Sequence, residues 1–218
     1  MEYISVYHDK DACKNVIQER NEYTIMETKK QKLISIAKDI RDCNDIKRSA
    51  ESLLEAFDID ASKEYVPIVE ILNAFGIKVY RQEMTDKQLS AYISVDPEYY
   101  DEYGTAKIAC VNSNDKLGHM RFALAHELAH YIYDFDKQRN TKFYSTYMKD
   151  QLKEDDVEQR ANEFAANLLM PAEVFISKKQ EFDKQTKNDR AETIVKLASH
   201  FGVLSQAIEK RYQELGLG

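Results

Sequence analysis

Apolar residues recur at intervals of three and four through the first 60 positions, a pattern typical of amphipathic helices. Two stripes stand out: Leu33, Ile36, Ala37 and Ile40, and then Ile46, Ala50, Leu53, Leu54 and Phe57. We expect both stripes to pack on the body of the protein; the alternative is a helix that binds a partner. A short run near the start, YISVY, predicts a strand.

From residue 65 the pattern becomes sharper. The stretch YVPIVEILNAFG predicts a helix with Pro67 in its first turn and Gly76 beyond its end. Three strand-like segments follow, IKVYR (77–81), LSAYISV (89–95) and TAKIACV (105–111). The turn-rich PEYYDEYG between the last two predicts an antiparallel hairpin with a long loop.

The second half of the chain is predicted to be mostly helical. The expected elements are a helix at 117–134, a polar, tyrosine-rich connection at 137–153, a helix at 154–170 that Pro171 stops, and helices at 190–201 and 205–215. Together these elements predict an α+β fold with a small antiparallel or mixed three-stranded sheet and mostly helical structure elsewhere.

The same pattern suggests three parts along the chain. Residues 1–60 form a helical segment, residues 61–180 the core, and residues 181–218 a helical tail that resembles a helix-turn-helix.

Composition narrows the class of protein. The formal charge of −7 gives no overall attraction to nucleic acid or to an anionic membrane. The three cysteines are widely spaced and contain no CxxC pair, which is typical of reduced thiols in a cytosolic protein. No signal-peptide pattern and no apolar run of about 20 residues is present. We therefore expect a soluble cytoplasmic protein with no membrane partner.

The stretch FALAHELAHYIY carries the clearest chemistry. His126 and His130 are four positions apart, so on a helix they share one face and can direct ring nitrogens at one metal ion. Glu127 points about 100° around the helix, where it can reach a water beside the metal. This is the geometry of a metal site with its own general base.

A third ligand has two candidates. Asp136 follows His130 by six residues, but a ligand there requires the chain to leave the helix sharply, generally at a glycine, and Tyr133 occupies that position. Glu158 lies on the later helix, and Asn162 one turn on can accept the outer N–H of a ligating histidine. Glu158 is the better candidate.

Small residues favour the close approach that a ligand from a second helix requires. They are Ala123, Ala125 and Ala129 on the first helix, and Ala161, Ala165 and Ala166 on the second. The acidic Asp155 and Asp156 suit the first turn of the second helix through its dipole.

RFALAHELAH (121–130) and EQRANEFAANLLMP (158–171) resemble the ImmA/IrrE-type metallopeptidases. VPIVEILNAFGIKV (66–79) and KIACVN (107–112) are more loosely similar, while Ala123 stands where a threonine is common. The resemblance implies a zincin-like fold of the gluzincin type, in which the small sheet packs on the 117–134 helix that carries HExxH. It also implies that His126, His130 and Glu158 bind the metal and that Glu127 is the base.

The resemblance also implies a substrate, a helix-turn-helix repressor encoded beside the peptidase, often on phages or mobile elements. The expected cofactor is Zn²⁺, although a His₂Glu site also tolerates Mn²⁺ or Fe²⁺. The expected activity is hydrolysis of peptide bonds by a metalloendopeptidase. An extended substrate is expected to add to a sheet edge at 89–95.

Several side chains are conceivable donors to the developing oxyanion, and the sequence favours none of them. They are Tyr131, Tyr133, Tyr144, Tyr147 and His119.

The tail at 194–215 offers a rival function. Ala198, Gly202 and Ile208 occupy positions expected of a helix-turn-helix, with Gln206, Lys210 and Arg211 as conceivable DNA contacts. Glu209 and Glu214 offset the two basic residues, which argues against DNA binding. The alternative is a regulator that binds DNA or a repressor and has a sensory or residual metal site.

Overall fold

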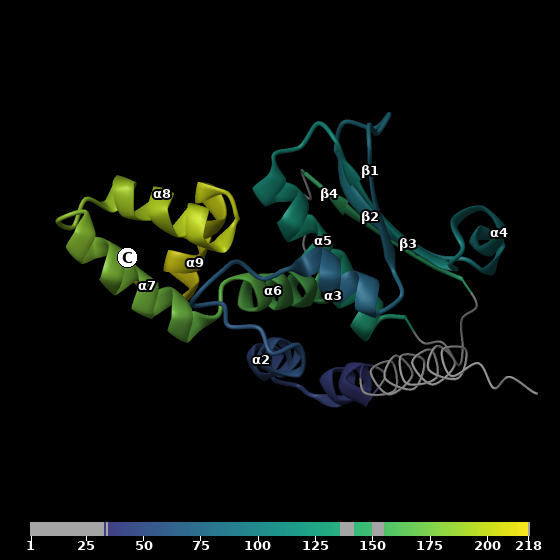
Figure 1. Cartoon of the computed structure of the whole chain (residues 1–218), viewed down its shortest axis with the longest axis horizontal. Helices are drawn as coiled ribbons and strands as arrows, with labels where there is room; N and C mark the ends of the chain where they lie inside the picture. The colour runs from purple at the N-terminus through teal and green to yellow at the C-terminus, as the bar shows by residue number, and fades with distance from the viewer. Residues whose placement is uncertain (1–32, 34, 136–141, 150–154, 218) are drawn as a thin grey trace, which may run out of the picture.

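The computed structural model describes residues 33, 35–135, 142–149 and 155–217. Within these ranges a four-stranded sheet lies beside a group of helices, and the three C-terminal helices lie at the opposite end of the molecule from the sheet (Figure 1). The predicted α+β class with mostly helical content is therefore confirmed.

The sheet is mixed. Its strands are β1 (Lys78–Gln82), β2 (Leu89–Val95), β3 (Lys107–Asn112) and β4 (Phe143–Met148), in the order β1-β3-β2-β4. β1 runs parallel to β3, whereas β2 is antiparallel to both β3 and β4. The predicted hairpin is confirmed, and its long loop contains the short helices η1 (Pro97–Tyr99) and α4 (Tyr100–Tyr103).

The prediction of three strands is wrong, because β4 lies within the segment that was predicted to be a connection. The sequence FYSTYM has no aliphatic run, since β4 is an edge strand of the sheet within the described ranges and its side chains are at most partly buried. Its tyrosines and threonine still favour a strand, and this was the missed signal. β2 is flanked on both sides, so the expectation that a substrate adds at 89–95 is also wrong.

Helix α5 (Leu117–Tyr133) crosses the sheet face and is buried along most of its length. Helix α3 (Ile68–Ala74) lies beside it, with Pro67 immediately before its first residue and Gly76 after its end at φ 74°. A left-handed residue there suits glycine, which has no Cβ to clash. Both predicted boundaries of this helix are thus confirmed.

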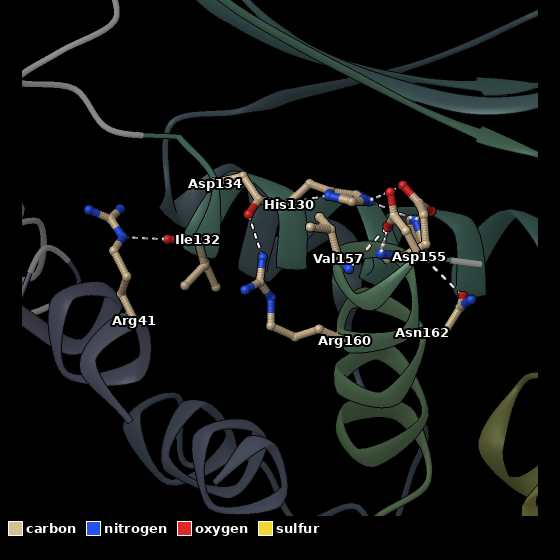
Figure 2. Close-up of polar contacts among 10 residues, drawn as sticks. Arg41, His130, Ile132, Asp134, Asp155, Val157, Arg160 and Asn162 are labelled. Carbon is tan, nitrogen blue, oxygen red and sulfur yellow. Dashed lines mark hydrogen bonds and ion pairs between the residues drawn. The ribbon is translucent and has the colours of Figure 1, made fainter. Parts of the chain in front are cut away.

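The N-terminal stripes pack as expected. Residues 35–42 are helical, Leu33 and Ile40 are buried, and α2 (Ile46–Ala56) buries Ala50 and Leu53 against α6 (Asp156–Leu169). Arg41 donates to the backbone carbonyls of Ile132, at 2.8 Å, and of Phe135, at 3.0 Å, so this segment caps the end of α5 (Figure 2). The predicted strand YISVY lies outside the described residues.

The C-terminal part contains α7 (Ala172–Gln185), α8 (Arg190–Phe201) and α9 (Ser205–Glu214). Helices α8 and α9 were predicted, whereas α7 was not. Pro171 ends α6 as expected, but it is also the residue before α7, because a proline fits the start of a helix where no N–H partner is needed. Phe175, Phe201 and Tyr212 pack together in the core of these helices.

The turn between α8 and α9 packs on the first residues of α5. A Cβ at Gly118 would lie 2.7 Å from the carbonyl carbon of Val203, so only glycine permits this approach. Arg121 joins the same regions by donating to the carbonyls of Gly202 and Val66. The start of α5 therefore forms part of the surface on which the C-terminal helices pack. Whether the three predicted segments are separate domains stays a prediction.

Among the described helices, none is long and apolar enough to cross a membrane.

Candidate metal centre

The two histidines of α5 face one point. Their Nε2 atoms lie 2.9 Å apart, and both side chains are buried. The helix continues through Tyr133, as the sequence analysis required, so the four-residue spacing places both rings on the same face.

Glu158 reaches both histidines from α6. Its Oε2 lies 3.1 Å from Nε2 of His126, and its Oε1 lies 3.3 Å from Nε2 of His130. Asp155 accepts hydrogen bonds from the backbone N–H groups of Val157 and Glu158, which fixes the first turn of α6 (Figure 2). A carboxylate in this turn is also favoured by the helix dipole.

The predicted close approach of the two helices is present. Ala123, Ala125 and Ala129 on α5 are buried in the same core as Ala161 and Ala165 on α6. Small side chains on both helices favour this close approach, and Glu158 reaches both histidine rings from α6.

Each ring is held on its outer side by a hydrogen-bond acceptor. The Nδ1 of His126 lies 2.9 Å from Oδ1 of Asn162, which is the contact that the sequence predicted for this asparagine. The Nδ1 of His130 lies 2.8 Å from Oδ2 of Asp134. Because both partners are acceptors, each Nδ1 carries the hydrogen, and each Nε2 presents a lone pair to the centre.

Asp134 is a site residue that the sequence analysis missed. It follows His130 by four positions, which is the spacing that could have revealed it. It stands at the C-terminal end of α5, where a negative charge is unfavourable to the helix dipole. Arg160 of α6 forms an ion pair with its other oxygen and lies 4.8 Å from the centroid of the Tyr133 ring, so the charge is compensated (Figure 2).

The donor set fits a divalent metal ion. Two imidazole lone pairs and a carboxylate converge, with all three ligand atoms within 4.8 Å of one another. Electron-rich atoms held this close repel one another unless a cation lies among them. Two histidines and one glutamate are a ligand set of catalytic zinc sites, in which a fourth position stays open.

Glu127 lies next to this centre and is fully buried. Neither of its carboxylate oxygens has a hydrogen-bond partner of ordinary geometry among the described residues. Burial raises the pKa of Glu127 well above its usual value, and the charge of Glu158 adds to the rise. The nearby Ser145 hydroxyl and the backbone of Ile93 lower that pKa in part. A buried carboxyl group whose pKa is raised is suited to accepting and returning a proton.

Comparison with known proteins agrees with this geometry. A family model, Peptidase_M78, described as the IrrE N-terminal-like domain, matches residues 72–213. This match covers more than half of the chain and includes α5, α6 and most of the C-terminal helices.

The chain belongs to this peptidase family. A comparison with curated proteins finds no match. Membership confirms the resemblance drawn from the two motifs, and it makes the His126, His130 and Glu158 cluster a candidate metal centre of an M78-family peptidase. The rejected ligand candidate, Asp136, lies outside the described residues.

The conceivable oxyanion donors of this M78-family chain separate into two groups. Tyr131 lies near Phe75 and Lys107, and Tyr133 packs on Phe164, so these rings are occupied by packing. Tyr147 of β4, by contrast, has its ring centroid 4.6 Å from that of His126.

Two further candidates lie near β4. The ring of His119 lies 5.7 Å from that of Tyr147, and burial lowers the pKa of His119. Tyr144 is mostly exposed; partial burial raises its pKa, and the charge of Glu127 adds to the rise. Tyr147 is therefore the candidate whose ring contacts a proposed ligand.

Proposed function

We propose that the protein is a zinc-dependent endopeptidase. The observation that carries this proposal is the convergence of two histidine Nε2 atoms and both carboxylate oxygens of Glu158, with the buried Glu127 beside them. Family membership supports peptide bonds as the target.

His126, His130 and Glu158 would hold the zinc ion, and Asn162 and Asp134 keep the two rings oriented for it. A bound zinc ion supplies Lewis-acid polarisation and lowers the pKa of a coordinated water towards about 7. Glu127 accepts a proton from the attacking water and delivers it to the nitrogen of the leaving amine. Mn²⁺ or Fe²⁺ would be tolerated by the same donors.

β4 is the natural partner for an extended substrate. It is the edge strand of the described sheet on the side of β2, and its Ser145 lies near Glu127 while its Tyr147 lies on His126. A peptide that adds to this edge by backbone hydrogen bonds would pass over the metal centre.

The physiological substrate that we propose is a helix-turn-helix repressor encoded beside the peptidase, and cleavage would take place in the cytoplasm. This part of the proposal rests on the resemblance of the two motifs to the ImmA/IrrE-type metallopeptidases.

Replacing Glu127 by glutamine tests the proposed mechanism. Glu127→Gln should retain one zinc ion per chain, because it changes no ligand, and should lose about 10²- to 10⁴-fold in rate, the usual contribution of a general base. Metal content is measured by elemental mass spectrometry, and cleavage is measured on the adjacently encoded repressor.

Glu163→Gln is the matched control, since Glu163 is an exposed residue of α6 and should be neutral. Cleavage that survives Glu127→Gln would remove Glu127 as the base. Repressor release that survives both this variant and a chelator would instead support the rival function, a protein that acts by binding.

The DNA-binding form of the rival loses Arg211 as a contact, whereas Gln206 and Lys210 are exposed. Arg211 is buried and donates to the carbonyl of Met170 and to Oδ1 of Asn167, so it faces the protein interior. Binding of operator DNA is measured directly, as salt-dependent association of the purified protein.

A further inference from the structure

A cavity of about 270 Å³ adjoins the metal centre on the side of the C-terminal helices. Phe122 of α5, Ala166 of α6 and Met170, which follows α6, give it apolar walls, while Ala207 and Lys210 of α9 also line it. It is thus formed where the helical tail meets the two helices that carry the candidate ligands.

Two residues of the cavity wall contact His126 of the metal centre. Asn162, which contacts Nδ1 of His126, also lines the cavity, and so does Tyr147, whose ring lies on that of His126. A peptide lying along β4 over the centre would therefore direct one of its side chains towards α9.

The size of the cavity matches one side chain. Its volume is slightly below the roughly 300–1,000 Å³ of pockets that hold small molecules, so an independent cofactor is a poorer fit.

The charges around the cavity leave a positive excess. Lys149 is paired with Asp115, and Glu214 is paired with Arg211 at 3.1 Å. Lys210 forms no ion pair with any described residue and is exposed at the cavity. The cavity therefore combines apolar walls with one unneutralised ammonium group, which complements an aliphatic stem that ends in a carboxylate.

We propose that this cavity is a substrate subsite that selects a glutamate side chain next to the scissile bond, with Lys210 of α9 as its specificity-determining residue. The proposal rests on the proposed peptidase function. Gln206 and Lys210 of α9 are also the residues that the sequence pattern associates with DNA. In this proposal they line a subsite that selects the bond to be cut.

The test uses full-length, zinc-loaded protein and a synthetic library of blocked decapeptides, with cleavage sites read by mass spectrometry. The wild type should favour glutamate at one position beside the cleaved bond. Lys210→Glu should lower that preference about tenfold and favour lysine or arginine instead, because like charges then meet in the cavity.

A second variant tests the volume of the cavity. Ala207→Phe should shift the same position towards small residues and leave the other positions unchanged, because the new ring fills the space. Lys184→Glu and Ala191→Phe are matched controls, since both residues are exposed and neither lines the cavity. A wild-type profile in both Lys210→Glu and Ala207→Phe would overturn the subsite.

A binding measurement separates failure of the subsite from failure of the peptidase function. The same peptides are retained on immobilised Glu127→Gln protein and on the Glu127→Gln, Lys210→Glu double variant. Enrichment of glutamate peptides on the Glu127→Gln protein, but not on the double variant, supports the subsite. If the wild type then cuts no peptide, only the peptidase function is overturned. Equal retention on both proteins would overturn the subsite even where cleavage is seen.

Discussion

The two sides of the metal centre are built differently. On the His130 side, the outer nitrogen contacts a carboxylate, Asp134, that is itself paired with Arg160. On the His126 side, the outer nitrogen contacts a neutral amide, Asn162, and the ring lies against that of Tyr147. Both of these partners line the cavity. The outer partner is therefore charged and ion-paired on one side, and neutral and part of the cavity wall on the other.

The two outer partners are therefore expected to affect their histidines differently. A carboxylate partner raises the basicity of its histidine and strengthens the metal bond, whereas an amide fixes orientation with little charge. The neutral side can then border the substrate cavity without placing a negative charge where a glutamate side chain is proposed to bind.

Removing the ligand that joins the two sides should have the largest effect. Glu158 contacts both histidines, so Glu158→Ala should weaken zinc binding by more than the roughly 10- to 100-fold that loss of an outer partner costs. Affinity is measured by competition with a chelating dye, with Glu163→Ala as the control on the same helix. Unchanged affinity would return Asp136 to consideration as the third ligand.

Asp134→Ala should be next, with a loss of zinc affinity near 100-fold, because it removes the charged partner of His130 and leaves Arg160 beside the centre. Arg160→Ala tests whether the ion pair matters, and it should cost less than Asp134→Ala since the histidine contact remains. If Asp134→Ala binds zinc as the wild type does, the two sides are energetically equal.

Asn162→Ala should cost less, about tenfold in zinc affinity, because only a neutral acceptor is lost. The same competition assay applies. If Asn162→Ala loses more zinc affinity than Asp134→Ala, the comparison is reversed, and the outer partner of His126 contributes more to metal binding than that of His130.

The smallest expected effect concerns the stability of the metal-free protein. A glutamate in an unfolded chain loses its proton near its ordinary pKa of 4.5, whereas burial holds the folded pKa of Glu127 well above that value. The folded state then binds more protons, so this group lowers stability as pH rises above 4.5. Metal-free Glu127→Gln should therefore unfold at a higher temperature than the wild type at pH 7.5. The difference should shrink towards pH 5, and thermal unfolding with excess chelator at both pH values measures it.

Much of the centre was predictable because its geometry is local. The spacing of His126 and His130 places them on one helical face, and the alanines of two helices indicate where those helices meet. The partnership of Glu158 with the pair followed from these two local patterns and from the absence of a glycine at Tyr133. Asp134 follows the same local spacing, but it lies at the C-terminal end of α5, where the helix dipole does not favour a carboxylate, so the pattern does not select it as a partner of His130.

β4 and α7 were missed for different reasons. β4 is half-buried at the sheet edge, so selection for apolar residues is weak and its six residues read as a polar connection. Helix α7 is not predicted because Pro171 indicates only the end of α6, although a proline also suits the start of the next helix.

By itself, the sequence determined the class of fold, the family, and the residues that can carry the chemistry, because helical periodicity and motif spacing are properties of neighbouring positions. Only the tertiary structure decided that β4 borders the site, that Asp134 and Arg160 support His130, and that α9 forms a wall of the cavity. These facts depend on contacts between segments far apart in the chain, such as the approach of Val203 to Gly118. Packing, and not the local pattern of α9, placed Gln206 and Lys210 at a cavity whose wall also contains Asn162 and Tyr147.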